Sequence, residues 1–180
     1  PAITKLIKRL GKPLVICNIV GGYGTDPRWC DGTRRGKIQA FVKKVYSCDD
    51  MQAMTNEALY DAIVSDITVD EFAGTERYRS RRRAECLESV AYICPLCGAR
   101  HTIYTKKNTV YCASCGMELT YNEDQTLSSK DGKFPFKYVH EWYDYQLKVL
   151  QETDFADDEK IFGDYVEVYK PKLGKKKELV

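Results

Sequence analysis

Cys94-Pro95-Leu96-Cys97-Gly98 and, thirteen residues later, Cys112-Ala113-Ser114-Cys115-Gly116 decide the fold of the second half of this 180-residue chain. Two residues separate the cysteines of each pair, so one tight turn can direct both sulfurs to one point. Two such turns supply four thiolates, which close the tetrahedral shell of a zinc ion. The glycine after each pair tolerates the positive φ that lets backbone amides approach the sulfurs. We therefore predict one structural zinc per chain, bound by Cys94, Cys97, Cys112 and Cys115.

Two other uses of these cysteines stay open, namely an iron–sulfur centre and a pair of disulfides. A shell of four thiolates leaves no position for a reactive water, so the spacing favours a structural role over a catalytic one. Binding of the metal would help to fold a segment that is too small to stabilise itself.

The residues between and after the two cysteine pairs predict a zinc ribbon over 93–122. Alternating β-formers at 102–105 and 108–111 predict a hairpin, and 118–121 predict a third strand. The ribbon contains only three basic residues, and they form no stripe that would match a phosphate backbone. We therefore prefer a structural role for the ribbon to nucleic-acid binding. These three residues are Arg100, Lys106 and Lys107.

The first half of the chain predicts an α/β unit. Apolar residues at positions 3, 6, 7 and 10 have helical spacing, and the β-branched run 14–20 is typical of a strand buried on both faces of a parallel sheet. A second strand is expected over 36–46 and a helix over 56–67, capped by Thr55 or Asn56.

Two further helices are expected, over 81–91 and over 138–150, the second rich in aromatic residues and docked on the main body. The predicted fold class is therefore α/β, with a small β zinc ribbon. The expected divisions are an α/β domain at 1–92, the ribbon at 93–122, a linker and helix at 123–153, and the start of a further β segment at 154–180. Residues 165–169 are the strand expected in that last part.

The net charge of +2 results from strongly segregated blocks. Residues 1–46 carry ten basic and two acidic side chains, whereas residues 47–76 carry eight acidic and no basic ones. Five arginines follow between positions 77 and 83. Such blocks can mark a surface for phosphate or anionic lipid, but solvated helix faces give the same pattern. No apolar run approaches the length of about 20 residues that spans a bilayer.

The loop after the 14–20 strand is the candidate ligand-binding segment, because open α/β sheets place ligands at the carboxyl ends of their strands. Tyr23, Arg28 and Trp29 would give it an exposed cluster of aromatic rings and a guanidinium, which suits an amphiphilic anion. Asp31-Gly32-Thr33-Arg34 could hold a phosphate, but so short a match carries little weight. Gly21-Gly22-Tyr23-Gly24 does not have dinucleotide-binding spacing. Its glycines indicate a flexible loop or a close approach of a ligand.

The remaining cysteines and the two histidines predict no catalytic group. Cys17 and Cys86 are expected to be small buried hydrophobic residues. His101 lies inside the ribbon and is expected at the surface, with the role of a substitute metal ligand as the alternative. His140 is expected to be a partly buried packing residue, because no nucleophile lies near it in the sequence.

Five motifs outside the ribbon form a series along residues 1–150. They are Pro13-Leu14-Val15-Ile16-Cys17-Asn18-Ile19, Gly22-Tyr23, Pro27-Arg28-Trp29 with Arg35-Gly36-Lys37, Arg83-Ala84-Glu85-Cys86-Leu87-Glu88, and Trp142-Tyr143-Asp144-Tyr145-Gln146-Leu147. Together with the ribbon, this series resembles the later half of bacterial 1-acyl-glycerol-3-phosphate acyltransferases. It is similar to a subgroup from Gram-positive anaerobes whose acyltransferase domain carries a zinc ribbon.

The resemblance implies a parent enzyme of phospholipid biosynthesis, in which a histidine base oriented by an aspartate activates the free hydroxyl of lysophosphatidic acid. That hydroxyl would attack an acyl thioester of coenzyme A or acyl carrier protein. Tyr23, Arg28 and Trp29 would lie on the acceptor side. The resemblance also implies peripheral attachment to the cytoplasmic side of a membrane through anionic headgroups, and no nucleic-acid partner.

The family's catalytic signature, a histidine and an aspartate separated by four residues, is missing from this chain. Lys106 stands at that position after His101, and Tyr145 stands there after His140. We therefore expect the chain to begin within a domain and to be inactive by itself. The alternative is a self-standing zinc-ribbon module that binds nucleic acid or a protein, or that serves as an assembly surface for a partner or a second copy.

Overall fold

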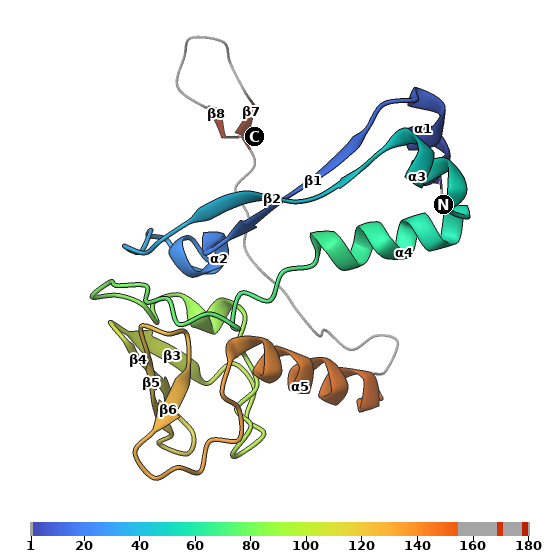
Figure 1. Ribbon diagram of the computed structural model, residues 1–180. Coiled ribbons are helices and arrows are strands. Elements are labelled where there is room, and N and C mark those ends of the chain that lie inside the picture. Colours follow the sequence, from blue (N-terminus) through green and yellow to red (C-terminus); the bar gives the residue numbers. More distant parts are fainter. Residues whose placement is uncertain (1, 155–168, 171–177, 180) are drawn as a thin grey trace. The chain divides into compact units, whose positions relative to one another are not determined.

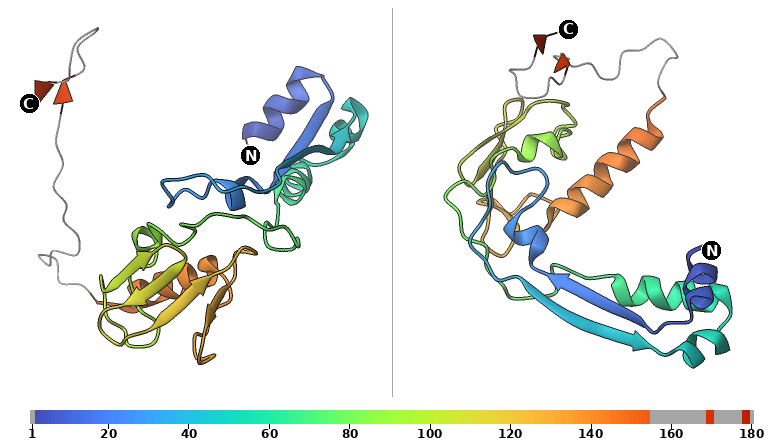
Figure 2. Two further views of the ribbon diagram at one scale, coloured as in Figure 1. Left: turned by 90° about the vertical axis from the view of Figure 1, so that its left-hand side faces the viewer. Right: turned by 90° about the horizontal axis from the view of Figure 1, so that it is seen from above.

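Strands β1 (Leu14–Val20) and β2 (Gln39–Tyr46) pair along their whole length in the computed structural model (Figure 1, Figure 2). The pairing is antiparallel, with Leu14 opposite Tyr46 and Val20 opposite Gln39, so the expectation of a parallel sheet is wrong. The connecting loop turns back and contains only the short helix α2 (Gly22–Thr25). A parallel pair would need a crossover helix that packs on the sheet, and this loop supplies none.

The two faces of this sheet differ in their burial. Ile16 and Tyr46 are buried in a small core with Met51 and Leu59. On the other face, residues of β1 that alternate with Ile16 are exposed, so β1 is not buried on both sides as its sequence predicts. The expectation fails because this strand has one covered face and not two.

Three helices accompany β1 and β2, and their ends follow from local chemistry. Helix α1 (Ala2–Leu10) ends at Gly11, whose φ of +58° is accessible to glycine. Helix α3 (Cys48–Ala53) begins with a capping box between Ser47 and Asp50. Helix α4 (Asn56–Ile67) is capped by the Thr55 hydroxyl, which accepts from the Ala58 N–H at 3.1 Å. The predictions of helices over 2–10 and 56–67 are confirmed.

The ribbon is a four-stranded antiparallel sheet in sequence order (Figure 1). Its strands are β3 (Ile103–Lys106), β4 (Thr109–Cys112), β5 (Glu118–Tyr121) and β6 (Leu127–Ser129). The first three agree with the predicted strands to within one residue. The fourth was not predicted, because three residues are too few to show an alternating pattern.

Residues 81–91 form turns and one short 3₁₀ helix, Leu87–Ser89, in place of the predicted helix. Residues of the ribbon accept hydrogen bonds from backbone N–H groups of this segment that would otherwise donate within a helix. The Ala84 N–H donates to the Lys107 carbonyl at 2.9 Å, and the Arg83 N–H donates to Asn108 Oδ1 at 2.9 Å. Tertiary hydrogen bonds therefore replace the helical ones over this segment.

Helix α5 (Val139–Glu152) packs through its aromatic side against the segment that enters the ribbon. Its buried Trp142 donates from Nε1 to the Ile93 carbonyl at 2.8 Å. Gln146 is also buried, and its Oε1 accepts from the N–H groups of Tyr92 and Ile93 at 2.7 and 2.8 Å. The predicted aromatic helix is confirmed.

The structure describes residues 2–154, 169–170 and 178–179. Residues up to Leu147 form one unit, and those from Lys148 onward belong to a second. In the second unit, β7 (Tyr169–Lys170) pairs antiparallel with β8 (Glu178–Leu179). The predicted strand at 165–169 lies, apart from its last residue, outside the described residues.

Candidate metal centre

The four predicted ligands lie together in space. The sulfur atoms of Cys94, Cys97, Cys112 and Cys115 are all within 4.8 Å of one another. The Cys94 and Cys115 sulfurs are 3.7 Å apart, and the Cys97 and Cys112 sulfurs are 3.8 Å apart. Sulfur atoms about 2.3 Å from a tetrahedral zinc are separated by about 3.8 Å, whereas a disulfide bond measures about 2.05 Å. The geometry is therefore consistent with one zinc site.

Two tight turns direct these sulfurs, as the spacing predicts. The Gly98 N–H donates to the Cys94 carbonyl at 2.8 Å, and the Gly116 N–H donates to the Cys112 carbonyl at 3.0 Å. Both glycines have positive φ, 71° and 73°. Each turn thus closes with the backbone conformation that favours glycine, and its amide groups face the sulfurs.

The surroundings shift the pKa values of the two buried thiols, Cys94 and Cys112, in opposite directions. Burial raises the pKa of Cys94 to about 12. Burial acts on Cys112 in the same direction, but hydrogen bonds from the Thr102 hydroxyl, 3.3 Å away, and from backbone amides lower its pKa to about 6. Of Cys94 and Cys112, Cys112 is therefore the thiol that more readily supplies a thiolate for a metal. The sequence gives no sign of the part that Thr102 plays here, because only the folded hairpin places its hydroxyl beside this sulfur.

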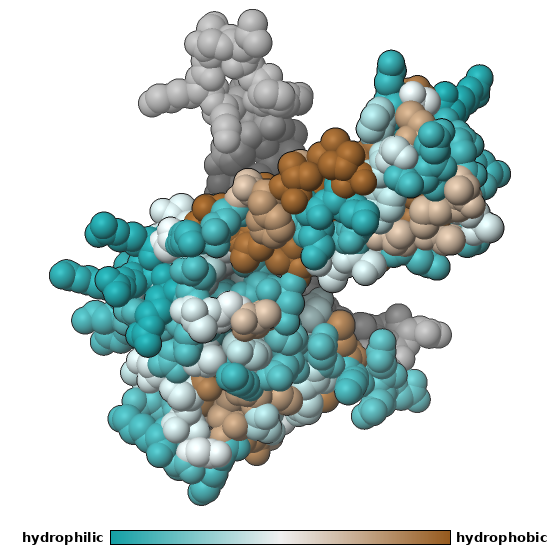
Figure 3. All heavy atoms as spheres, in the orientation of Figure 1, coloured by the Kyte–Doolittle hydropathy of each residue, from teal (hydrophilic) through white to brown (hydrophobic). Residues whose placement is uncertain are grey.

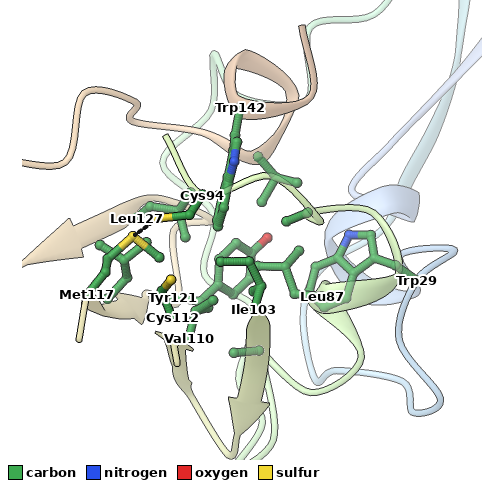
Figure 4. Packing of buried hydrophobic residues seen from close by; sticks show 14 residues of the cluster. Trp29, Leu87, Cys94, Ile103, Val110, Cys112, Met117, Tyr121, Leu127 and Trp142 are labelled. Atoms are coloured by element: carbon green, nitrogen blue, oxygen red, sulfur yellow. Dashed lines mark hydrogen bonds between the residues drawn. The ribbon is translucent and has the colours of Figure 1, made fainter. Parts of the chain in front are cut away.

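The inner side of the cluster is part of the ribbon's hydrophobic core. Cys94 and Cys112 are buried there beside Val110 and Leu119, and Met117 Sδ lies 3.9 Å from Cys94 Sγ (Figure 4). The outer two ligands, Cys97 and Cys115, are exposed. A metal at this position would link the two surface turns to the core. Its four thiolate ligands would leave no free coordination position for a water or a substrate.

The candidate ligand-binding loop is partly used for packing. Trp29 is 6% exposed and joins the ribbon core, so the expectation of an exposed aromatic ring at this position is wrong. Its Nε1 donates to the Tyr23 hydroxyl at 3.2 Å, and Tyr23 is half-buried. Arg28 is exposed. Of the three predicted residues, Tyr23 and Arg28 are the ones that solvent reaches.

Arg34 has a structural role that its sequence motif does not indicate. Arg34 is 3% exposed, and its guanidinium carbon lies 4.8 Å from the centroid of the Trp29 ring and 4.9 Å from that of the Tyr121 ring. The two ring centroids are themselves 5.6 Å apart, so the guanidinium packs against both rings. Nη2 donates to the Arg83 carbonyl at 2.8 Å. This side chain is therefore not available to a phosphate, and it fixes the loop to the ribbon.

The loop glycines are explained by an aromatic ring of the same chain. A Cβ atom on Gly24 or Gly36 would lie 2.3 Å from the Tyr78 ring, closer than any atom can approach. Tyr78 itself is 2% exposed. Tyr78 thus makes the close approach at Gly24 and Gly36, and at Gly21 it is made by the Lys37 carbonyl oxygen, 2.1 Å from where a Cβ atom would lie. The Gly21 N–H donates to Glu71 Oε2 at 2.8 Å and fixes the start of the loop.

Among residues 2–154, the other cysteines form no hydrogen bond with a histidine. The Cys86 thiol donates to Asp31 Oδ2 at 3.6 Å, and burial and this carboxylate raise the pKa of Cys86. Cys17 is exposed and Cys86 is half-buried, so the prediction that both are core residues is wrong. His101 is exposed, as predicted. His140 is exposed as well, so the prediction that it is partly buried is wrong, although its ring packs on Phe72 with centroids 4.7 Å apart.

Comparisons of the chain with protein-family models, with curated proteins and with solved structures give no match. Among the described residues, no helix combines the length and the apolar character needed to span a bilayer. The function of the chain must therefore be inferred from its residues and their arrangement, of which the four-cysteine cluster is the most specific feature.

Proposed function

We propose that this chain is the acceptor-side part of a bacterial 1-acyl-glycerol-3-phosphate acyltransferase, with the catalytic histidine and aspartate upstream of Pro1. The observation that carries the proposal is the uncovered face of the β1–β2 sheet. Four large apolar side chains on this face are each about half exposed, and together they form one continuous surface (Figure 3). They are Val15 at 49%, Ile19 at 59%, Val42 at 57% and Val45 at 53%.

An antiparallel sheet often leaves one face to solvent, but that face is then usually polar. Here the exposed face is apolar, and monomeric proteins rarely expose a large continuous apolar patch. Two strands by themselves are also fewer than a stable sheet needs. The bare face supports the expectation that further strands and helices of an acyltransferase domain complete this layer.

The loop after β1 is suited to the acceptor side because it is held rigidly from two directions. Tyr78 fills the space between its glycines, and Arg34 fastens it to the ribbon. Tyr23 and Arg28 remain accessible to an amphiphilic anion such as lysophosphatidic acid. A guanidinium pairs well with a phosphate, and it keeps its charge at any physiological pH.

The proposed reaction is acyl transfer from a thioester of coenzyme A or acyl carrier protein. The upstream histidine takes the proton of the acceptor hydroxyl, whose oxygen attacks the thioester carbonyl. The C–S bond then breaks, and the departing thiolate takes up the proton. The parent enzyme would lie on the cytoplasmic face of the membrane, held by its basic segment.

We propose that the bound metal is zinc and that it is structural. The ion would hold the ribbon together, and the ribbon would hold the loop through Arg34. Zinc would therefore affect acyl transfer through the position of the loop and would touch neither substrate.

The test is made on the complete reading frame that contains this chain. It should encode a histidine and an aspartate separated by four residues upstream of Pro1, and its product should convert lysophosphatidic acid and an acyl thioester into phosphatidic acid. In that product, Arg28→Gln should raise KM for the acceptor and leave kcat nearly unchanged. Lys130→Gln, far from the loop in sequence, is the matched control. A frame without the catalytic motif would refute the proposal.

A second candidate is a binding module for nucleic acid, favoured by the gathering of Arg35 with the arginines of residues 77–83. It predicts binding of oligonucleotides that weakens steeply with salt. If a titration with single-stranded DNA at low salt shows no binding, a nucleic-acid-binding function is excluded.

A further inference from the structure

A trough of basic side chains runs beside the ribbon, and neither the metal centre nor the proposed acceptor site uses it. Two open cavities of about 770 and 650 Å³ adjoin one another and share Arg35 and Arg79 in their walls. We call this surface the arginine trough. Its basic members come from three separate parts of the chain: Arg35, Lys37, Arg77, Arg79, Arg81, Arg83 and Lys107.

The backbone builds the trough by pairing two arginines directly. The Arg35 N–H donates to the Arg79 carbonyl at 2.9 Å, and the Arg79 N–H donates to the Arg35 carbonyl at 2.8 Å. Residues paired in this way project their side chains from the same face, and like charges at such positions destabilise the pair. An anion between the two guanidinium groups would relieve this repulsion.

Buried groups hold this pair in place. Tyr78, next to Arg79, is enclosed between Gly24 and Gly36, next to Arg35. The Tyr78 N–H also donates to the Glu123 carbonyl at 2.7 Å. The backbone of Arg35 and Arg79 is therefore fixed by the fold, while the Arg79 side chain, 71% exposed, extends into solvent where a ligand can reach it.

Positive charge exceeds negative charge in the trough. Glu123 is the acid in the larger cavity, and its carboxylate lies 4.0, 3.6 and 3.8 Å from Arg77, Arg79 and Arg83. In the smaller cavity, Glu76 lies 3.8 Å from Lys37. Within residues 2–154, Arg35 and Arg81 form no ion pair. Their fork-shaped guanidinium groups remain free to bind oxygen atoms in pairs.

We propose that the arginine trough binds the phosphate groups of an anionic ligand, a phosphomonoester or a pyrophosphate. The paired guanidinium groups of Arg35 and Arg79 would bind its oxygen atoms. The lining of both cavities contains no aromatic side chain on which a base could stack, and stacking is the usual basis of single-strand recognition. A lipid headgroup and a soluble phosphate compound share the required chemistry. The inference is independent of acyl transfer.

The test uses the zinc-loaded full chain and three probes. Isothermal titration with sodium pyrophosphate measures binding of a soluble phosphate. Sedimentation with phosphatidylcholine vesicles, with and without phosphatidic acid, measures binding of a headgroup. A titration with oligothymidylate measures nucleic-acid binding under the same salt. We expect binding to pyrophosphate, to the phosphatidic-acid vesicles, or to both, and the arm that responds identifies the source of the phosphate.

Three variants connect the binding to the trough. The double variant Arg35→Gln/Arg79→Gln should weaken binding at least about tenfold, because two charged contacts are lost. The matched control is Arg82→Gln/Lys130→Gln, which removes the same charge outside the trough and should change affinity less than about twofold. Glu123→Gln should tighten binding, since it removes the acid that competes for the arginines. Zinc content and thermal unfolding verify that each variant is folded.

Four outcomes would overturn the proposal. They are an absence of binding to both phosphate probes, an equal loss in the double variant and its control, an unchanged affinity in the folded double variant, and oligothymidylate binding that is tenfold tighter than binding to either phosphate probe. The last result would establish the arginine trough as a nucleic-acid surface.

Discussion

The ribbon and the β1–β2 layer achieve very different degrees of burial. The hydrophobic core around the ribbon contains fourteen buried residues, whereas that beside β1 and β2 contains four. The ribbon's core includes two cysteines of the metal cluster and the ring of Trp142 from α5. The β1–β2 layer leaves a whole sheet face exposed. The difference teaches that a small sheet can complete its core when other segments pack on it, as α5 and the two cysteine turns do on the ribbon.

Loss of the metal should produce the largest effect in this comparison. Cys112→Ser removes one ligand of the closed shell, and the ribbon should unfold because binding of a structural zinc contributes about 10 kcal/mol or more to folding. We expect about one zinc per chain for the parent protein and far less for the variant. Elemental analysis measures the metal, and tryptophan fluorescence follows unfolding around Trp142.

Cys17→Ser is the control for this experiment, because Cys17 is an exposed cysteine outside the cluster. It should retain the zinc and the melting temperature. Iron in place of zinc, or an unchanged fold after chelation, would show that the ribbon is not stabilised in the way that the sulfur geometry indicates.

Truncation of Trp142 to alanine should have the next largest effect, about 3–5 kcal/mol in the free energy of unfolding. The side chain is fully buried, and the Ile93 carbonyl would lose its hydrogen-bond donor. Tyr143→Ala, at a position on the same helix that is 44% exposed, should cost much less. Urea unfolding measures both values. Similar costs for the two variants would mean that α5 does not close the ribbon core.

Arg34→Gln should separate the loop from the ribbon and leave the ribbon itself intact. We expect a loss of about 2–3 kcal/mol, because the variant removes the guanidinium that packs against two rings and leaves the Arg83 carbonyl without its charged donor. Arg28→Gln, at an exposed position of the same loop, should change stability by less than about 0.5 kcal/mol. Hydrogen exchange of residues 21–36 should accelerate in the first variant and not in the second.

Substitutions on the bare sheet face should have the smallest effect in this chain. Val45→Thr changes a side chain that is 53% exposed and should alter the unfolding free energy by about 0.5 kcal/mol or less. Ile16→Thr, on the covered face, should cost about 1–3 kcal/mol, since it places a hydroxyl in the small core.

The same Val45→Thr substitution tests whether further parts of a larger domain cover this sheet face. In the product of the complete reading frame it should cost clearly more than in this chain, if the rest of a domain covers the sheet. Equal costs in the two proteins would argue against the proposed acyltransferase layer.

Short-range sequence patterns predicted the helices and strands whose ends and faces are set by residues close by in the chain. The helices α1 and α4 follow from apolar spacing with Gly11 and Thr55 at their ends. The first three ribbon strands follow from alternation between the cysteine pairs. The predicted helix at 81–91 failed because its backbone groups bond to the ribbon, and no local pattern reports such a partner.

The metal ligands were predictable for the same reason, since two residues between cysteines is a local property. The residues that support the site were not. Thr102 lowers the pKa of Cys112 from across a hairpin, and Arg34 contacts Tyr121 across eighty-seven positions of sequence. Trp29 was expected at the surface because nothing nearby in the sequence reveals that the ribbon would cover it.

The sequence by itself determined that two cysteine turns can close one metal shell, because the geometry of a C-x-x-C turn is contained in four residues. It also determined the helices α1, α4 and α5 and the first three strands of the ribbon, whose patterns are local. Only the tertiary structure decided the antiparallel pairing of β1 and β2, the burial of Trp29 and Arg34, and the meeting of Arg35 with Arg79. Each of these depends on long-range contacts, whose free energy comes from surfaces brought together and not from any property of the local chain.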